Sequence, residues 1–140
     1  MQLRFTYIEI QNMIASKTGK QLPMSYCDDH TVRIGYEVNV LFKTTTVGLD
    51  ITVDSVEGEN IYLSYNGGMG IEFMVRTALS KVKEQPGGDM IEPLDGCRLL
   101  IRLGKNEQLS PIFERIELKD IHFDVETVMI DFMPKASALV

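Results

Sequence analysis

The chain has 140 residues and a mass of 15.8 kDa, which is the size of one ordinary domain. Hydrophobic residues make up 44% of it and charged residues 24%, which excludes a largely disordered or fibrous protein. Twenty acidic residues against fourteen basic ones give a net charge of −6. This charge argues against a nucleic-acid partner, because affinity for phosphate comes mostly from basic side chains.

The sequence indicates neither a membrane span nor a secretory leader. No apolar run approaches the roughly 18 residues of a spanning helix, so we expect no transmembrane segment. Residues 1–5 lack the apolar core of a signal peptide. Two cysteines, Cys27 and Cys97, are too few for a disulfide framework and suit a reducing compartment. We therefore expect a single soluble domain over residues 1–140 in the cytoplasm.

Three segments have the pattern of helices. Thr6 and Glu9 have the spacing of a capping box, and apolar residues follow at three- and four-residue intervals, so a helix is predicted over 6–18. The widest apolar stripe of the chain predicts a second helix over 71–84. A short third helix is predicted at about 107–116, where a serine and a proline suit the first positions.

Apolar and polar residues alternate in most of the remaining segments, which is typical of strands with one solvent-exposed face. The alternation runs through residues 31–42, changes parity at 43–45 and continues to position 53. This change indicates either a hairpin turn or a bulge in one long strand, and the pattern does not decide between them. Further alternation predicts strands at 61–65 and 97–103 and a hairpin at 121–132.

These elements predict an α+β fold with a curved antiparallel sheet of six to seven strands, whose apolar face packs against the helices at 6–18 and 71–84. Leu79 lies in the middle of the second helix's apolar stripe. If it packs in a core, Leu79→Ala should cost about 2–5 kcal/mol, and if it lines an open ligand tunnel the cost should be small. Arg76→Ala, on the outer side, should cost under about 0.5 kcal/mol.

Two pairs of residues have side chains suited to metal ions. Asp28 and His30 lie within one turn, and His122 and Asp124 lie two residues apart on a predicted strand. Neither pair alone offers the three or four ligands that zinc needs, and turn or strand-surface chemistry explains both. A metal site therefore requires the two pairs to meet. The sequence has no Gly-x-Ser-x-Gly motif, and we expect no catalytic residue and no cofactor.

The distributed apolar content is the feature that points to a function. Eight methionines and five tyrosines accompany long strands with an apolar inner face. One explanation is an ordinary core in which methionine fills irregular gaps, and the other is a groove that accepts an acyl chain or another amphiphile. The candidate lining residues of such a groove are Tyr36, Val38, Phe42, Ile51, Met74 and Leu79.

Three segments, VEGENIYLSY at 56–65, NGGMGIEFMVRTALSKV at 66–82 and IELKDIHFDVETVMIDFM at 116–133, resemble a family of small, functionally uncharacterised bacterial domains. That family in turn resembles the tubular lipid-binding (TULIP-like) superfamily: over residues 6–133, the order of the elements and the spacing of the hydrophobic residues are similar to those of the superfamily. In that superfamily a strongly bent sheet wraps a long helix and forms an apolar tunnel. The resemblance implies a lipid-binding fold without enzymatic activity, and it carries over no catalytic residue.

Two hypotheses of function follow from the sequence. The first is a non-catalytic domain that binds a lipid or other apolar ligand in a groove between sheet and helices. The second is an interaction or assembly module without a small ligand, most simply a homodimer joined through an edge strand or a helix face.

Overall fold

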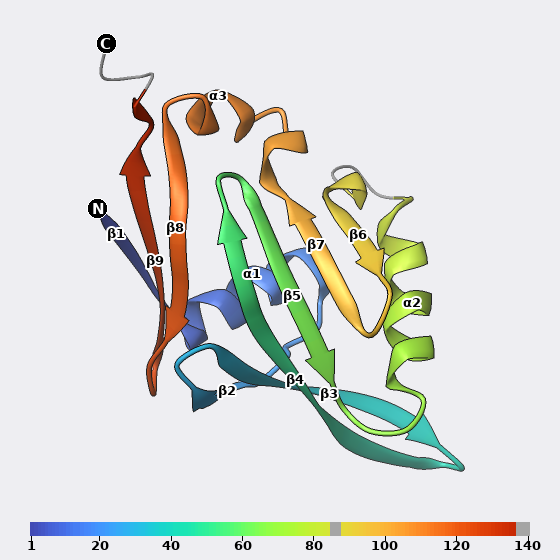
Figure 1. Cartoon of the computed structure of the whole chain (residues 1–140). Coiled ribbons are helices and arrows are strands. Elements are labelled where there is room, and N and C mark those ends of the chain that lie inside the picture. Colours follow the sequence, from blue (N-terminus) through green and yellow to red (C-terminus); the bar gives the residue numbers. More distant parts are fainter. Residues whose placement is uncertain (85–87, 137–140) are drawn as a thin grey trace.

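The computed structural model describes residues 1–84 and 88–136. Within this part of the chain, nine strands form two antiparallel sheets and are accompanied by three α-helices (Figure 1). The strands are β1 (Gln2–Thr6), β2 (Met24–Asp28), β3 (Thr31–Val40), β4 (Lys43–Glu57), β5 (Asn60–Asn66), β6 (Ile91–Leu94), β7 (Arg98–Arg102), β8 (Ile116–Phe123) and β9 (Thr127–Pro134). The helices are α1 (Tyr7–Thr18), α2 (Ile71–Val82) and α3 (Ser110–Phe113). The predicted α+β fold with antiparallel strands is confirmed.

The larger sheet has six strands in the order β2-β3-β4-β5-β7-β6, and the smaller has three in the order β1-β9-β8. The smaller sheet pairs the N-terminal strand with the last hairpin, which the sequence pattern did not indicate. Two backbone hydrogen bonds join the sheets: Leu118 N of β8 donates to Gly58 O, just after β4, and Phe123 N of β8 donates to Asp29 O, just after β2, both at 2.7 Å. Figure 1 accordingly shows β8 beside β4.

The parity change at 43–45 marks a hairpin turn. Val40 of β3 pairs with Lys43 of β4, and Leu41 and Phe42 form the two-residue turn between them. Both turn residues have positive φ angles, 48° and 68°, as in the type I′ turns that close tight hairpins. The structure therefore answers the question that the sequence left open between a hairpin and one bulged strand.

α2 begins at the predicted residue, and α1 begins at Tyr7, one residue after the predicted start, because Thr6 is its N-cap. Glu9 N donates to Thr6 Oγ1 and Thr6 N donates to Glu9 Oε1, both at 3.1 Å, which completes the capping box of α1. Gly70 precedes α2 with a φ of 80°, a conformation that glycine adopts without strain. α2 ends at Val82 rather than at 84, and α3 is a single turn of four residues. No helix in the two described ranges is long and apolar enough to cross a bilayer.

The main hydrophobic core lies between the two sheets rather than beneath α2. Its buried side chains come from both sheets, from the start of α1 and from α3, and are Tyr7, Val32, Val53, Ile61, Phe113, Leu118, Ile121, Phe123 and Val128. α2 buries one residue, Ile71, which is not part of this cluster. The body of α2 therefore packs beside the core, and several of its apolar side chains remain at the surface.

A bulge in β8 decides which side chains of the small sheet face the core. The pairing with β9 shifts between Leu118 and Asp120, so Lys119 is an extra residue in the strand. Leu118 and Ile121 are consequently both buried in the core, while Asp120 and His122 lie on the opposite, partly exposed face.

Candidate functional site

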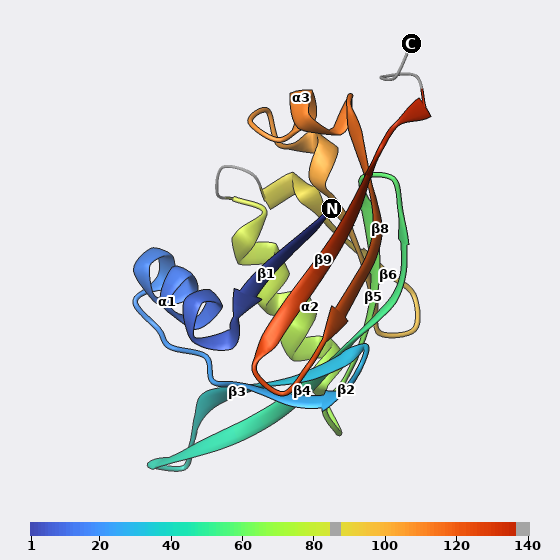
Figure 2. The ribbon, with the colours of Figure 1, turned by 90° about the vertical axis from the view of Figure 1, so that its left-hand side faces the viewer.

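A groove of about 820 Å³ opens between α2, the C-terminal end of α1 and the β3–β4 hairpin. In Figure 2, α1 and the end of this hairpin lie on the same side of the sheets. The groove is lined by Lys17, Lys20, Tyr36, Leu49, Ile71, Phe73, Met74, Val75, Thr77, Ala78, Lys81 and Val82. Most of the lining is apolar and comes from α2, where Phe73 is 76% exposed and Met74 is 36% exposed. Exposed apolar side chains gathered along one groove are typical of a binding surface.

Three lysines add positive charge to this apolar groove. Lys17 belongs to the last turn of α1, Lys20 lies two residues after the end of that helix, and Lys81 belongs to the last turn of α2. The described lining residues include no carboxylate, although the whole chain carries a net charge of −6. An apolar groove with positive charge at its walls suits a ligand that has an apolar body and a negative head group.

Tyr36 and Met74 are the two predicted groove residues that line the groove. The Tyr36 hydroxyl donates to Met74 Sδ at 3.5 Å, which joins β3 to α2 across the groove. Burial raises the pKa of Tyr36 above its ordinary value, so its hydroxyl stays protonated and remains a hydrogen-bond donor at neutral pH.

The other predicted groove residues lie elsewhere. Phe42 occupies the hairpin turn and is fully exposed, because β3 ends at residue 40 and does not continue to 42. Ile51 packs against the core between the sheets, because the face of β4 that meets the groove at Leu49 enters the core two residues later. Leu79 is half-buried on α2 but does not line the groove. The side chain of Val38 lies outside the described part of the structure.

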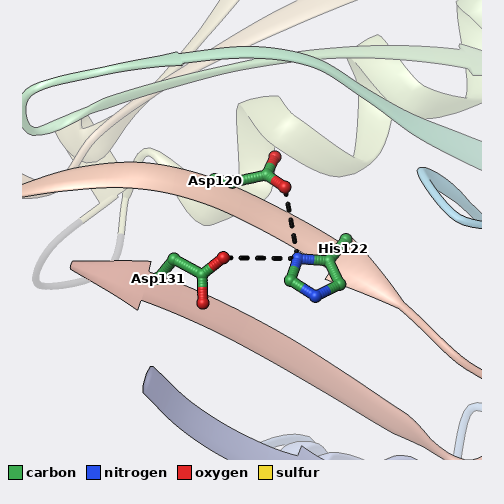
Figure 3. Close-up of side chains that lie close together, drawn as sticks. All are labelled: Asp120, His122 and Asp131. Atoms are coloured by element: carbon green, nitrogen blue, oxygen red, sulfur yellow. Dashed lines mark ion pairs between the residues drawn. The ribbon is translucent and has the colours of Figure 1, made fainter. Parts of the chain in front are cut away.

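The two histidines that were predicted as candidate ligands both contact Asp120, an aspartate that was not among the predicted ligands. His30 Nε2 lies 3.4 Å from Asp120 Oδ1, and His122 Nδ1 lies 3.2 Å from Asp120 Oδ2. Asp131 of β9 approaches the same His122 nitrogen, with its Oδ2 at 3.7 Å (Figure 3). We refer to His30, Asp120, His122 and Asp131 as the histidine–aspartate cluster.

The two aspartates predicted to accompany these histidines hold turns instead. Asp28 Oδ1 accepts a hydrogen bond from the backbone N–H of His30 at 2.9 Å. Asp124 Oδ1 accepts from the Thr127 hydroxyl and backbone N–H, each at 2.7 Å, and from the Glu126 N–H at 3.0 Å. These hydrogen bonds, the one from the Thr127 hydroxyl first, lower the pKa of the Asp124 carboxyl. Neither aspartate belongs to the histidine–aspartate cluster.

Comparisons of the chain with protein-family models, with curated proteins and with solved structures find no match. A function for this protein therefore has to be inferred from the groove and from the histidine–aspartate cluster.

Proposed function

We propose that this protein is a non-catalytic binding domain for a single-chain amphiphile with a negatively charged head, of the fatty-acid type. The observation that carries the proposal is the groove beside α2, which combines an apolar lining with three lysines. Its volume of about 820 Å³ lies within the range of roughly 300–1,000 Å³ that is usual for small-molecule sites.

The apolar part of the ligand would supply most of the affinity. Phe73 and Met74 expose apolar surface on α2 that an acyl chain would cover. Each buried methylene group contributes about 0.8 kcal/mol, which corresponds to roughly a fourfold change in affinity. The lysines would pair with the head group and orient the chain, a contribution that an uncharged ligand cannot make.

Displacement of a fluorescent acyl probe by saturated fatty acids of increasing length tests the proposal. We expect affinity to rise about fourfold for each methylene group until the groove is filled. The fatty alcohol of the same length should bind more weakly, because it lacks the charged head. Native mass spectrometry of the freshly purified protein should also detect a bound amphiphile.

Two variants and one control distinguish binding in this groove from nonspecific hydrophobic binding elsewhere on the protein. Met74→Asp introduces a carboxylate among the apolar residues, and Lys81→Glu reverses one of the three positive charges. Both should weaken binding of the fatty acid. Lys105→Glu makes the same charge change outside the groove and should leave binding unchanged. A wild-type protein that binds no probe, or three variants that behave alike, would contradict the proposal.

The alternative function is a homodimer without a small ligand. The observation that favours it is the position of β2 at one edge of the six-stranded sheet, with Tyr26 on this strand 38% exposed. Exposed edge strands commonly pair with a second copy. Light scattering at micromolar concentration tests this function: a dimer that binds no acyl probe would support it, and a strict monomer would exclude it.

A further inference from the structure

We propose that the histidine–aspartate cluster binds a zinc ion through His122 Nδ1 and one oxygen each of Asp120 and Asp131. All three residues lie on one face of the β8–β9 hairpin, and their ligand atoms lie within 4.8 Å of one another (Figure 3). The site shares no residue with the groove beside α2, so it does not depend on the function proposed above.

The two distances from His122 to the aspartates are close to the ligand spacing of zinc. With bonds of about 2.0–2.1 Å, a tetrahedral zinc ion holds neighbouring ligand atoms roughly 3.3–3.4 Å apart. His122 Nδ1 lies 3.2 Å from Asp120 Oδ2 and 3.7 Å from Asp131 Oδ2. Both distances from His122 are within a few tenths of an ångström of the zinc spacing, and the ligand atoms of Asp120 and Asp131 lie within 4.8 Å of each other.

The central nitrogen of the cluster lacks a hydrogen bond. His122 Nδ1 is buried, yet it makes no hydrogen bond with any described residue, although both carboxylate oxygens lie near it. The contact with Asp120 has the distance of an ion pair but not the direction of a hydrogen bond. Because buried polar atoms are normally satisfied, this nitrogen requires a partner, and a metal ion between the three ligand atoms would provide one.

The second oxygen of each carboxylate already has a partner. Gln2 Nε2 donates to Asp131 Oδ1 at 2.9 Å, and His30 Nε2 lies 3.4 Å from Asp120 Oδ1. Both Oδ2 atoms, in contrast, face His122. Partners of this kind orient the ligands in known metal sites, and they keep the metal-facing oxygen in position.

The charges of the cluster also favour a bound cation. Asp120 and Asp131 are direct cross-strand neighbours, an arrangement in which two negative charges destabilise a sheet. Within the described part of the chain, neither carboxylate forms an ion pair with a lysine or an arginine. A divalent ion would neutralise both charges at once.

The donor set indicates zinc rather than magnesium or calcium. One imidazole nitrogen and two carboxylate oxygens are common zinc ligands, whereas magnesium and calcium prefer six or more oxygen ligands. The three side chains are between 26% and 45% exposed, so an ion can reach them from solvent. Three protein ligands would leave the fourth zinc position to water.

Isothermal titration of zinc into chelator-treated, dialysed protein tests the site. The wild type should bind one zinc ion per chain, and magnesium at the same concentration should give no saturable heat. His122→Ala and Asp131→Asn should each lose this binding. Gln2→Ala should weaken it by about 10- to 100-fold, the usual effect of removing a partner of a metal ligand. Asp89→Asn, which removes an equal charge from a surface position outside the cluster, should bind zinc like the wild type.

Asp131→Asn keeps the experiment decisive if other variants fold poorly. Its amide oxygen can still accept from Gln2, and the substitution removes the repulsion with Asp120. The metal-free variant should therefore unfold at a temperature no lower than the metal-free wild type. Zinc should raise the unfolding temperature of the wild type and of Asp89→Asn but not that of Asp131→Asn. The absence of saturable zinc binding in the wild type, or wild-type affinity in Asp131→Asn, would overturn the proposal.

Discussion

Replacing Leu118 by alanine tests where the core of this protein lies. The Leu118 side chain is 3% exposed and belongs to the buried cluster between the two sheets, together with Val53 and Phe123. Alanine removes three buried carbons, each worth about 0.8 kcal/mol, and leaves a cavity that two hydrogen-bonded sheets can close only partly. We expect the free energy of unfolding to fall by about 3–4 kcal/mol.

Leu79→Ala removes the same atoms from α2 and is the matched comparison. Leu79 is half-buried and lies outside the core cluster, so we expect a loss of only about 1 kcal/mol. Arg76→Ala should cost under about 0.5 kcal/mol, because its pair with Glu72 is exposed. Urea unfolding followed by circular dichroism measures all three losses, provided that the m-value is unchanged. Equal losses for Leu79→Ala and Leu118→Ala would refute a core between the sheets.

Two further predictions concern turns. Replacing Leu41 and Phe42 together by Asn and Gly, which adopt positive φ angles readily, should stabilise the protein by about 1–2 kcal/mol, measured as a higher urea midpoint. Because the Thr127 hydrogen bonds lower the pKa of Asp124 below its ordinary 3.8, the stability that they provide is present above pH 3.8 and is lost as the pH falls toward the lowered pKa. Asp124→Asn should show a smaller loss of urea resistance between neutral and acidic pH than the wild type.

The elements that could be predicted from the sequence are those set by a few neighbouring residues. The capping box of α1, the glycine before α2 and the alternation of β3 are local features, and each appears in the structure. The pairing of distant strands is not local. β1 (Gln2–Thr6) is short, and it is a strand because it pairs with β9 near the other end of the chain. Because this pairing could not be predicted from local sequence patterns, the second sheet and the core between the two sheets could not be predicted either.

The groove was predicted in part for the same reason. Tyr36 and Met74 lie on apolar stripes of single elements, and those stripes were visible in the sequence. Leu49 and Ile51 share one face of β4, yet the first lines the groove and the second packs in the core. Periodicity identifies the apolar face of a strand, but it cannot show where along that face one environment gives way to another.

The histidine–aspartate cluster shows which aspartates near a histidine in the sequence are good candidate ligands. An aspartate at a turn tends to accept hydrogen bonds from the next two or three residues, so its oxygens are already used. Asp28 and Asp124 are both in this position. Asp120 lies inside β8, far enough from the turn that its carboxylate stays available to both histidines. A carboxylate within a strand is therefore the better candidate ligand, and its cross-strand neighbour follows only from the register of the hairpin.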